Sequence, residues 1–181
     1  MNKKNDIYRA AIKLFVEEGE QATSMKWIAK QAKCGIGTMY NYFQSKDELI
    51  NDLYIEIKTK LFTSILTSFN SNNSVKQQFI EVWLRVMNFA VSYPLEYSFL
   101  EIFAYSPKIS KLASDEVNKL ISPLMQIVEK GKKEGIIKDI DTMLLVIFTN
   151  GAITSCILNN KDIDENGKKE IALMAWDAIK S

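Results

Sequence analysis

The feature that most constrains this fold is a pair of short apolar-periodic segments, separated by a very short break, between residues 24 and 49. The first segment, Met25 to Ala32, repeats apolar residues at helical spacing, and the second runs from Ile36 to Tyr42. Gly35 lies in the break. Two helices joined by so short a turn must cross steeply, which requires small residues at the crossing. The spacing therefore predicts a helix-turn-helix, whose second helix enters the major groove of DNA.

The second segment has the polar and apolar faces expected of a recognition helix. Helical periodicity places Thr38, Asn41 and Tyr42 on its outer face. The same periodicity turns Met39 and Phe43 back toward the core. We therefore expect a short DNA-reading helix that is anchored from behind by apolar packing.

The charge of the chain supports this interpretation only locally. The formal net charge is +1, so the chain lacks the overall basic footprint of many nucleic-acid-binding proteins. Between residues 22 and 46, however, no residue is acidic and four are lysines: Lys26, Lys30, Lys33 and Lys46. Lysines beside a phosphate backbone gain affinity from counterion release whatever the DNA sequence. The alternative is a lysine-bearing helix face that simply meets solvent.

The exit from the second segment has the chemistry of a helix start. Ser45 and Glu48 form the S-x-x-E pattern of a capping box, in which each side chain accepts a hydrogen bond from a backbone N–H near the other. Lys46 lies in the first turn, where backbone N–H groups already favour anions. We expect Lys46 to contact a phosphate rather than only solvent.

Between residues 7 and 50 a set of residues recurs at the spacing of a known DNA-binding domain: Ile7, Ala10, Ala11, Leu14, Phe15, Gly19, Ser24, Ile28, Ala29, Ala32, Gly37, Thr38, Tyr40, Phe43, Lys46 and Leu49. On these residues, the segment resembles the N-terminal domain of the TetR family of transcriptional regulators. The resemblance implies that Thr38 and its neighbours face the major groove, and it places four residues near phosphates: Ser24, Tyr40, Tyr42 and Lys46. Charge and resemblance together predict the DNA-contacting set Ser24, Lys26, Lys33, Gly37, Thr38, Tyr40, Asn41, Tyr42 and Lys46.

Four positions depart from the family pattern. Lys33 stands where the turn usually has glycine, and Gly35, which has no side-chain oxygen to cap a helix, stands where serine is usual. Glu20 replaces a common aromatic residue after Gly19. Trp27 replaces an acidic residue, and its large apolar surface favours packing under the domain, with DNA contact as the alternative.

Length and composition predict a single helical, cytoplasmic protein. The 181 residues are 47% hydrophobic and include only three prolines and seven glycines, which suits a sizeable core with few disordered linkers. No segment is apolar for long enough to cross a membrane, and the N-terminus lacks the apolar core of a signal peptide. Cys34 and Cys156 lie far apart without metal-ligand spacing, so no disulfide framework, metal site or other cofactor is expected.

The pattern of breaks predicts an all-α fold of about nine helices in two domains. Residues 1–47 would form a three-helix helix-turn-helix DNA-binding domain, and residues 48–181 a helical ligand-binding and dimerisation domain. Pro123 is expected to kink or divide the seventh helix. The helices expected after the recognition helix span residues 46–69, 75–92, 94 onward, 108 to either 131 or 135, 141–159 and 164–180.

A stripe of aromatic and sulfur-containing residues in the second domain fits either a pocket or a core. At helical spacing such residues are first of all the buried face of a helix. Resemblance to the TetR family implies an inducer cavity here for an apolar or amphipathic small molecule. The candidate lining residues are Phe79, Trp83, Met87, Phe99, Phe103 and Phe148. Glu81 and Arg85, four residues apart, are expected to form a solvated salt bridge.

The last two expected helices carry faces suited to self-association. The first has small residues that permit close helix approach, and the second has a broad apolar stripe. These faces either close the core of one chain or form a four-helix interface between two copies, and the resemblance favours the dimer. A two-fold dimer would match a palindromic DNA site. The candidate interface residues are Gly151, Ala152, Ser155, Ile171, Met174, Ala175 and Ala178.

These patterns favour a regulator over an enzyme. The chain has no histidine, no carboxylates paired at metal-ligand spacing and no phosphate-binding glycine loop. The predicted function is a homodimeric transcriptional regulator, a repressor released from a palindromic double-stranded DNA operator by a small-molecule inducer. The alternative is a helical scaffold that uses its helix-turn-helix for protein contacts and has no inducer. The lysine-only patch argues against that alternative.

Overall fold

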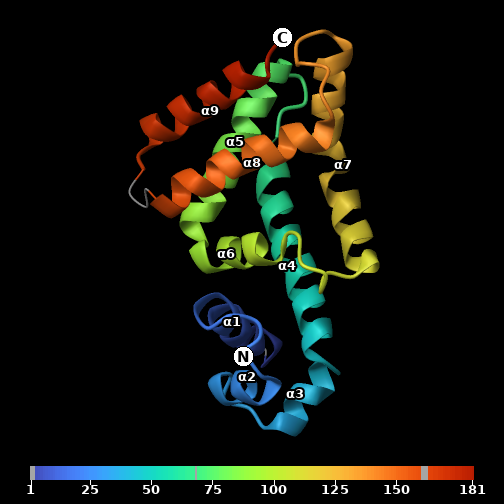
Figure 1. The fold of residues 1–181 in the computed structure, drawn as a ribbon, viewed down its shortest axis with the longest axis vertical. Helices are drawn as coiled ribbons and strands as arrows, with labels where there is room; N and C mark the ends of the chain where they lie inside the picture. Colours follow the sequence, from blue (N-terminus) through green and yellow to red (C-terminus); the bar gives the residue numbers. More distant parts are fainter. Residues whose placement is uncertain (1–2, 68, 160–162) are drawn as a thin grey trace. The chain divides into compact units, whose positions relative to one another are not determined.

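Nine α-helices make up the part of the chain that the computed structural model describes, residues 3–67, 69–159 and 163–181 (Figure 1). They are α1 (Lys3–Glu17), α2 (Met25–Gln31), α3 (Ile36–Tyr42), α4 (Lys46–Leu66), α5 (Val75–Ser92), α6 (Pro94–Phe103), α7 (Lys111–Lys133), α8 (Thr142–Asn159) and α9 (Glu165–Ile179). An isolated antiparallel bridge joins Ile137 to Lys180. The predicted all-α class is confirmed.

Side-chain chemistry accounts for most helix starts. Asp141 accepts a hydrogen bond from the Leu144 N–H at 3.0 Å at the start of α8, and Asp164 accepts one from the Gly167 N–H at 2.8 Å at the start of α9. Pro94 occupies the first position of α6, where its missing N–H has no helical partner to lose. These caps explain why the predicted starts agree closely with the observed ones.

Of the two outcomes expected at Pro123, a kink or a division of the seventh helix, the division is wrong. Pro123 lies inside α7, which continues through it to Lys133. A proline removes one backbone hydrogen bond and leaves those of its neighbours, so a long helix can continue past it. Two boundaries also differ from expectation, since α4 ends at Leu66 and α7 begins at Lys111.

One compact unit combines the described residues of 1–59 with residues 93–117. In it α1 packs against α2 and α6, and α2 packs against α3. The rings of Phe15 on α1 and Phe103 on α6 have centroids 5.8 Å apart, and Phe99 lies 4.6 Å from Phe103. All three rings are almost fully buried. The helix-turn-helix therefore rests on an aromatic core that α1 and α6 build together.

The second unit combines the described residues of 60–92 with those of 118–181. Its helix α5 packs against α8 and α9. The core of this unit includes Val75, Ile137, Leu145, Trp176 and Ile179, with Phe79 packed against it. Backbone hydrogen bonds from the Lys138 N–H to the Ile179 carbonyl (2.9 Å) and from the Ser181 N–H to the Ile136 carbonyl (3.0 Å) tie the end of α9 to the loop after α7.

The expected Glu81–Arg85 pair forms, at 2.7 Å, but it is half-buried rather than solvated. The Arg85 guanidinium also donates to the backbone carbonyls of Ser64 (3.1 Å) and Thr67. Carbonyls at the end of a helix have no intrahelical partner, and a cation there satisfies them. Arg85 therefore caps the end of α4.

Among the described residues, none of the helices combines the length and the apolar character needed to span a membrane.

Candidate nucleic-acid interface

The helix α2 begins at a well-formed polar cap. Ser24 has extended backbone geometry, and its side chain accepts a hydrogen bond from the Trp27 N–H at 3.2 Å. The next turn faces inward, because Met25, Ile28 and Ala29 are all buried. Ser24 itself is exposed. The cap therefore fixes α2 while leaving the first residue of the motif accessible.

The turn between α2 and α3 is a Schellman motif with an unusual residue at its centre. The Lys33 N–H bonds to the Lys30 carbonyl at 3.2 Å, and the Cys34 N–H bonds to the Ala29 carbonyl at 3.0 Å. This pattern places Lys33 in the left-handed region, with φ +52°. Glycine is the usual residue there because a Cβ atom is crowded in that conformation. The departure from the family pattern at Lys33 thus coincides with a strained backbone position.

The recognition helix α3 is anchored as predicted. Met39 is 0% exposed and Phe43 is 2% exposed, so both side chains lie in the core. Gly35 occupies the N-cap and makes no side-chain cap hydrogen bond. The residues expected on the outer face, Thr38, Asn41 and Tyr42, are all exposed. Gly37 and Tyr40, which also belong to the predicted contact set, are exposed as well. A short helix that is buried on one side and polar and aromatic on the other matches the organisation of a DNA-reading helix.

An open groove connects the two helices on this surface. Its lining includes two lysines, Lys26 and Lys30, which lie one turn apart on α2. Trp27 is half-buried and forms part of the same lining, so it neither packs fully under the domain nor stands free of it. The full lining is Ser24, Lys26, Trp27, Ala29, Lys30, Cys34 and Ile36. Lys30, Trp27 and Ile36 were absent from the predicted contact set, although the four-residue spacing of Lys26 and Lys30 pointed to a shared face.

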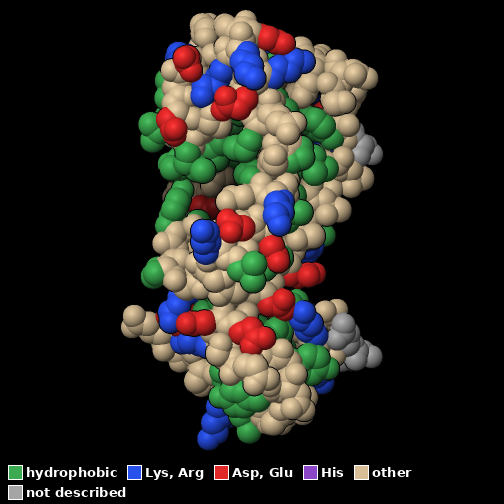
Figure 2. All heavy atoms as spheres, turned by 90° about the vertical axis from the view of Figure 1, so that its right-hand side faces the viewer, with side chains coloured by type: hydrophobic (Ala, Val, Ile, Leu, Met, Phe, Trp, Pro, Cys, Tyr) green, Lys and Arg blue, Asp and Glu red, His purple; other side chains and the backbone are tan. Residues whose placement is uncertain are grey.

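The charge of this surface is local. On the face drawn in Figure 2, acidic and basic side chains are interspersed, in keeping with a formal net charge of +1. On the helix-turn-helix itself Lys26, Lys30 and Lys33 are exposed. These three lysines can therefore attract a polyanion such as DNA, although the chain as a whole is almost neutral.

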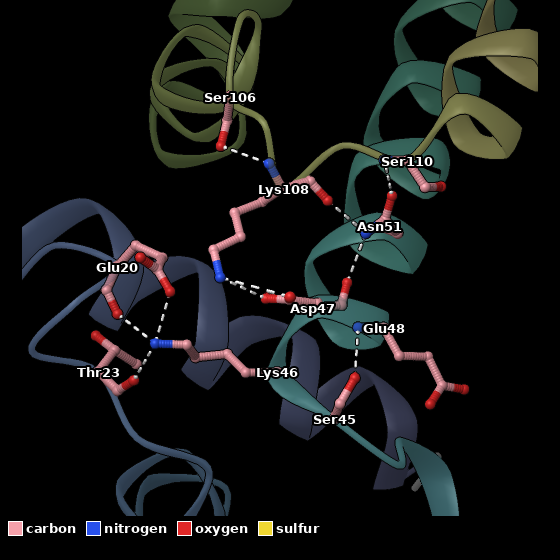
Figure 3. Close-up of polar contacts among 10 residues, drawn as sticks. All are labelled: Glu20, Thr23, Ser45, Lys46, Asp47, Glu48, Asn51, Ser106, Lys108 and Ser110. Carbon is pink, nitrogen blue, oxygen red and sulfur yellow. Dashed lines mark hydrogen bonds and ion pairs between the residues drawn. The ribbon is translucent and has the colours of Figure 1, made fainter.

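Lys46 does not share this exposure. Figure 3 shows its ammonium against the loop between α1 and α2, 2.6 Å from the Glu20 carboxylate. The same ammonium donates to the backbone carbonyls of Glu20 (2.8 Å) and Thr23 (3.2 Å). Its phosphate contact stays a prediction, and in this structure Lys46 already has three oxygen partners.

The start of α4 is capped, but not by the expected reciprocal box. The Ser45 hydroxyl accepts from the Glu48 N–H at 3.0 Å, as predicted. The Glu48 carboxylate, however, accepts from the Gln44 N–H at 2.6 Å rather than from the Ser45 N–H. Because α3 ends only a few residues earlier, the shifted bond fixes the angle between recognition helix and exit helix.

The loop before α7 is fastened to the first turns of α4 (Figure 3). The Asn51 side chain donates to the Lys108 carbonyl at 2.8 Å and accepts from the Ser110 N–H at 2.8 Å. The Lys108 ammonium lies 3.1 Å from Asp47, whose hydrogen bond raises the pKa of Lys108 above its ordinary value. Residues far apart in sequence thus brace the exit from the recognition helix.

A second polar cluster joins α1 to α4. The Tyr8 hydroxyl donates to the Asp52 carboxylate, and the Lys4 ammonium lies 2.8 Å from the same carboxylate. The Asp52 hydrogen bond raises the pKa of Lys4, whereas burial is the main cause that raises the pKa of Tyr8. The Lys4 ammonium also lies 5.1 Å from the centre of the Tyr8 ring. This cluster holds α1 behind the helix-turn-helix.

The structure divides the predicted ligand-lining residues among three environments. Phe99 and Phe103 lie in the aromatic core of the first unit with Phe15. In the second unit Trp83 and Met87 are buried, and Phe79 packs 5.6 Å from Trp176. Phe148 is 59% exposed on α8, so it lines no enclosed site within its own chain. Helical periodicity could not reveal this separation.

The predicted interface residues are also divided, between surface and core. Gly151 and Ser155 on α8 and Met174 and Ala178 on α9 are exposed. Ala152 and Ile171 are half-buried. Ala175 is only 6% exposed and belongs to the core of its own chain, because it shares the inward face of α9 with Trp176 and Ile179. It is therefore not accessible to a second copy.

A capped α2, a tight turn and an exposed, internally anchored α3 define a helix-turn-helix DNA-binding protein. Residues 7–53 match the sequence profile described as "Bacterial regulatory proteins, tetR family", and residues 54–181 match the one described as "Tetracyclin repressor-like, C-terminal domain". The chain belongs to the TetR family of helix-turn-helix transcriptional regulators.

Similar proteins agree with this assignment. The chain is 28% identical over 153 residues to "Uncharacterized HTH-type transcriptional regulator YhgD" of Bacillus subtilis (strain 168), covering 80% of this chain and 76% of that relative. A TetR family transcription regulator from Marinobacter aquaeolei VT8 has a similar fold, with a TM-score of 0.88 and 21% identity over 99% of this chain and 96% of that one. The regulator FadR from Bacillus subtilis, solved with stearoyl-CoA, matches with a TM-score of 0.72 and 17% identity, covering 96% and 95%.

Proposed function

We propose that this protein is a homodimeric repressor that binds a palindromic DNA operator and leaves it when a small apolar or amphipathic ligand binds. The observation that carries the proposal is the α2–α3 surface, where exposed hydroxyl, amide, aromatic and lysine side chains surround a buried anchor. We assign DNA binding to residues 1–47, and ligand binding and dimerisation to residues 48–181. The site of action is the cytoplasm, where a bacterial chromosome is accessible.

Within the recognition surface the side chains divide by chemistry. Thr38 and Asn41 on α3 carry short polar groups suited to hydrogen bonds with base edges. Lys26 and Lys30 on α2, with Lys33 in the turn, supply positive charge to the phosphate backbone. Ser24 can donate to a phosphate oxygen, as can the hydroxyls of Tyr40 and Tyr42. Phosphate contacts set the register, and Thr38 and Asn41 select the sequence.

Dimerisation through α8 and α9 is supported by a row of exposed residues that are large and apolar at one end and small at the other. Leu144, Phe148, Gly151 and Ser155 follow one another at helical spacing along one exposed face of α8. Leu144 and Phe148 are each 59% exposed, and Met174 on α9 is 71% exposed. We name the set Leu144, Phe148, Gly151, Ser155, Met174 and Ala178 the α8/α9 face. A second copy would remove this apolar area from water by a two-fold contact.

The ligand proposal draws on the family and on one neighbour. FadR of Bacillus subtilis was solved with stearoyl-CoA, an amphipathic molecule with a long apolar chain. The buried side chains Trp83 and Met87 in this chain could border a similar apolar ligand. Such a ligand acts only if it prefers the conformation in which the two recognition helices no longer match successive major grooves, about 34–36 Å apart.

DNA binding is tested by fluorescence anisotropy with a labelled random-sequence duplex at several salt concentrations. We expect affinity to fall linearly on a log–log plot as salt rises, and Lys26→Ala to lower the slope by about one. A scaffold that uses its helix-turn-helix only for proteins would show no salt-dependent binding.

The ligand is tested on the DNA complex with stearoyl-CoA as the probe. We expect added stearoyl-CoA to release the labelled duplex from the wild-type protein. Met87→Trp should retain DNA binding and lose this response, because the larger ring occupies the space for the acyl chain. Unchanged DNA binding in the presence of stearoyl-CoA removes this ligand class from the proposal.

A further inference from the structure

All three N–H donors of the Lys46 ammonium have oxygen partners on one short loop (Figure 3). These partners are the Glu20 carboxylate at 2.6 Å, the Glu20 carbonyl at 2.8 Å and the Thr23 carbonyl at 3.2 Å. An ammonium group has three N–H donors and no acceptor. A DNA phosphate can therefore bind Lys46 only by replacing one of these oxygens.

The two carbonyl oxygens belong to a loop whose backbone is fixed by hydrogen bonds. Gly19 has φ +85°, a conformation that glycine adopts without strain. The buried Thr23 hydroxyl lies 2.8 Å from the Gly19 carbonyl oxygen and 3.2 Å from that of Leu14, so its one proton is shared between them and fastens the loop to the end of α1. The Glu20 carboxylate, by contrast, sits at the end of a flexible side chain. Of the three partners it is the one that a phosphate can displace.

The electrostatics favour such an exchange. Lys46 and Glu20 have side-chain exposures of 25% and 21%, so solvent screens their attraction less than that of a surface pair. A phosphate that approaches Lys46 also approaches the Glu20 carboxylate, and two anions beside one ammonium repel each other. The Lys108 ammonium, which Asp47 holds at 3.1 Å, also feels the negative charge of Glu20, because that charge contributes to raising the pKa of Lys108. The displaced Glu20 carboxylate is left to solvent, so the exchange costs the Glu20–Lys46 attraction.

We propose that Glu20 is an intramolecular competitor of the DNA phosphate for Lys46, and that it lowers the affinity of the helix-turn-helix for DNA. This inference rests on the proposed DNA-binding function. Glu20 is an acidic residue in the loop directly before the helix-turn-helix. The consequence is a weaker, more readily reversed complex than the lysines of α2 and Lys46 would otherwise form.

The test compares two substitutions that remove the same charge. Glu20→Gln keeps the size of the side chain and one acceptor oxygen but removes the negative charge. Glu18→Gln removes the same charge from an exposed residue two positions earlier. With the labelled random-sequence duplex at one salt concentration, we expect Glu20→Gln to bind about fivefold more tightly per protomer. Glu18→Gln should change the affinity by less than about twofold.

A double-mutant cycle with Lys46→Met shows whether the effect of Glu20→Gln on DNA affinity depends on Lys46. If Glu20 acts through Lys46, the gain from Glu20→Gln disappears when Lys46 is already methionine. Glu20→Ala, a second neutral variant, should show the same gain, and thermal melts check that each variant is folded. The proposal is overturned if Glu20→Gln binds no more tightly than Glu18→Gln, or if the gain persists in the Lys46→Met background.

Failure of the underlying function is distinguishable. A wild-type protein without salt-dependent DNA binding removes the proposed function and this inference with it. A wild-type protein that binds DNA, with equal effects of Glu20→Gln and Glu18→Gln, removes only the competition.

Discussion

Two surfaces of this protein expose large aromatic or apolar side chains, but the residues beside those side chains differ in polarity and charge. On the recognition helix, Tyr40 and Tyr42 are 46% and 41% exposed, and the same helix-turn-helix also exposes lysine, threonine and asparagine side chains. On the α8/α9 face, Phe148 and Met174 are 59% and 71% exposed, and α8 carries no charged residue at all. All four side chains are exposed, but the first surface suits a polyanion and the second suits another apolar protein surface. The neighbours of an exposed side chain, more than its exposure, indicate the partner.

The two surfaces also differ in how they are held. The helix-turn-helix depends on local devices, which are the Ser24 cap, the Schellman turn at Lys33 and the bond from the Gln44 N–H to Glu48. The α8/α9 face depends on packing of its inward side against α5. Caps and turns involve few residues, so a single substitution that alters the backbone can weaken them. A packed face is weakened instead by substitutions that change the charge or the volume of a side chain.

The largest expected effect concerns the α8/α9 face. Phe148→Asp would place an unpaired charge in a desolvated interface, so the dimer should dissociate at least about 100-fold more readily. Leu112→Asp is the matched control, because Leu112 is 71% exposed on α7 and lies outside the α8/α9 face. Sedimentation velocity over a concentration series measures the effect. Equal dissociation of the two variants, or a monomeric wild type, contradicts the dimer proposal.

The next effect concerns base recognition by α3. Asn41→Ala should lower the preference for a selected operator over a scrambled one by about tenfold or more, because a base contact is worth about 1–3 kcal/mol. Lys30→Ala should weaken binding to both duplexes equally and lower the salt slope by about one. Paired anisotropy titrations distinguish the two outcomes. A uniform loss in Asn41→Ala would move that residue to the phosphate contacts.

A smaller effect concerns the backbone at Lys33. Because Lys33 has φ +52°, Lys33→Gly should relieve crowding and raise the free energy of unfolding by about 0.5–1 kcal/mol. Lys30→Gly is the matched control inside α2 and should lower it by about 1 kcal/mol. Urea denaturation monitored by circular dichroism measures both. The same sign for both variants would show that the left-handed turn carries no strain.

The smallest effect concerns alkaline stability of the contact between α1 and α4. The pKa values of Lys4 and Tyr8 are raised above their ordinary values of 10.5 and 10.0, so the folded chain binds these protons more tightly than the unfolded chain. This stabilisation is present below about pH 10 and is lost as the pH rises further. The double variant Lys4→Met/Tyr8→Phe should therefore lose less stability between pH 9 and pH 11, by about a kcal/mol or less.

Thermal melts across this range measure the difference, with Lys13→Met on the exposed side of α1 as the control. If the melting temperature falls equally with pH in the double variant and in the wild type, the Lys4–Tyr8–Asp52 cluster makes no contribution to alkaline stability.

Sequence patterns predicted the local parts of the helix-turn-helix well. Met39 and Phe43 are buried, and the Ser45 hydroxyl caps the start of α4. Each of these depends on residues within about one helical turn, where periodicity and capping rules apply directly. The same rules predicted the class of fold and most helix starts.

Long-range partners were not predictable in this way. Periodicity shows which residues share a helix face but not which neighbour covers that face, so Ala175 was placed at an interface and Phe148 in a pocket. The contact of Lys46 with Glu20 joins residues 26 positions apart, and that of Lys108 with Asp47 joins residues 61 apart. The paths of the intervening loops decide such contacts, and no local pattern encodes them.

The central claim is that two copies of the helix-turn-helix read one symmetric DNA site. Selection of bound sequences from a pool of random duplexes, with purified protein at moderate salt, tests it most directly. We predict enriched sequences in which two inverted half-sites lie about one helical turn of DNA, or a small multiple of it, apart. Enriched sequences without two-fold symmetry would contradict the paired geometry, and a pool without enrichment would contradict sequence-specific binding itself.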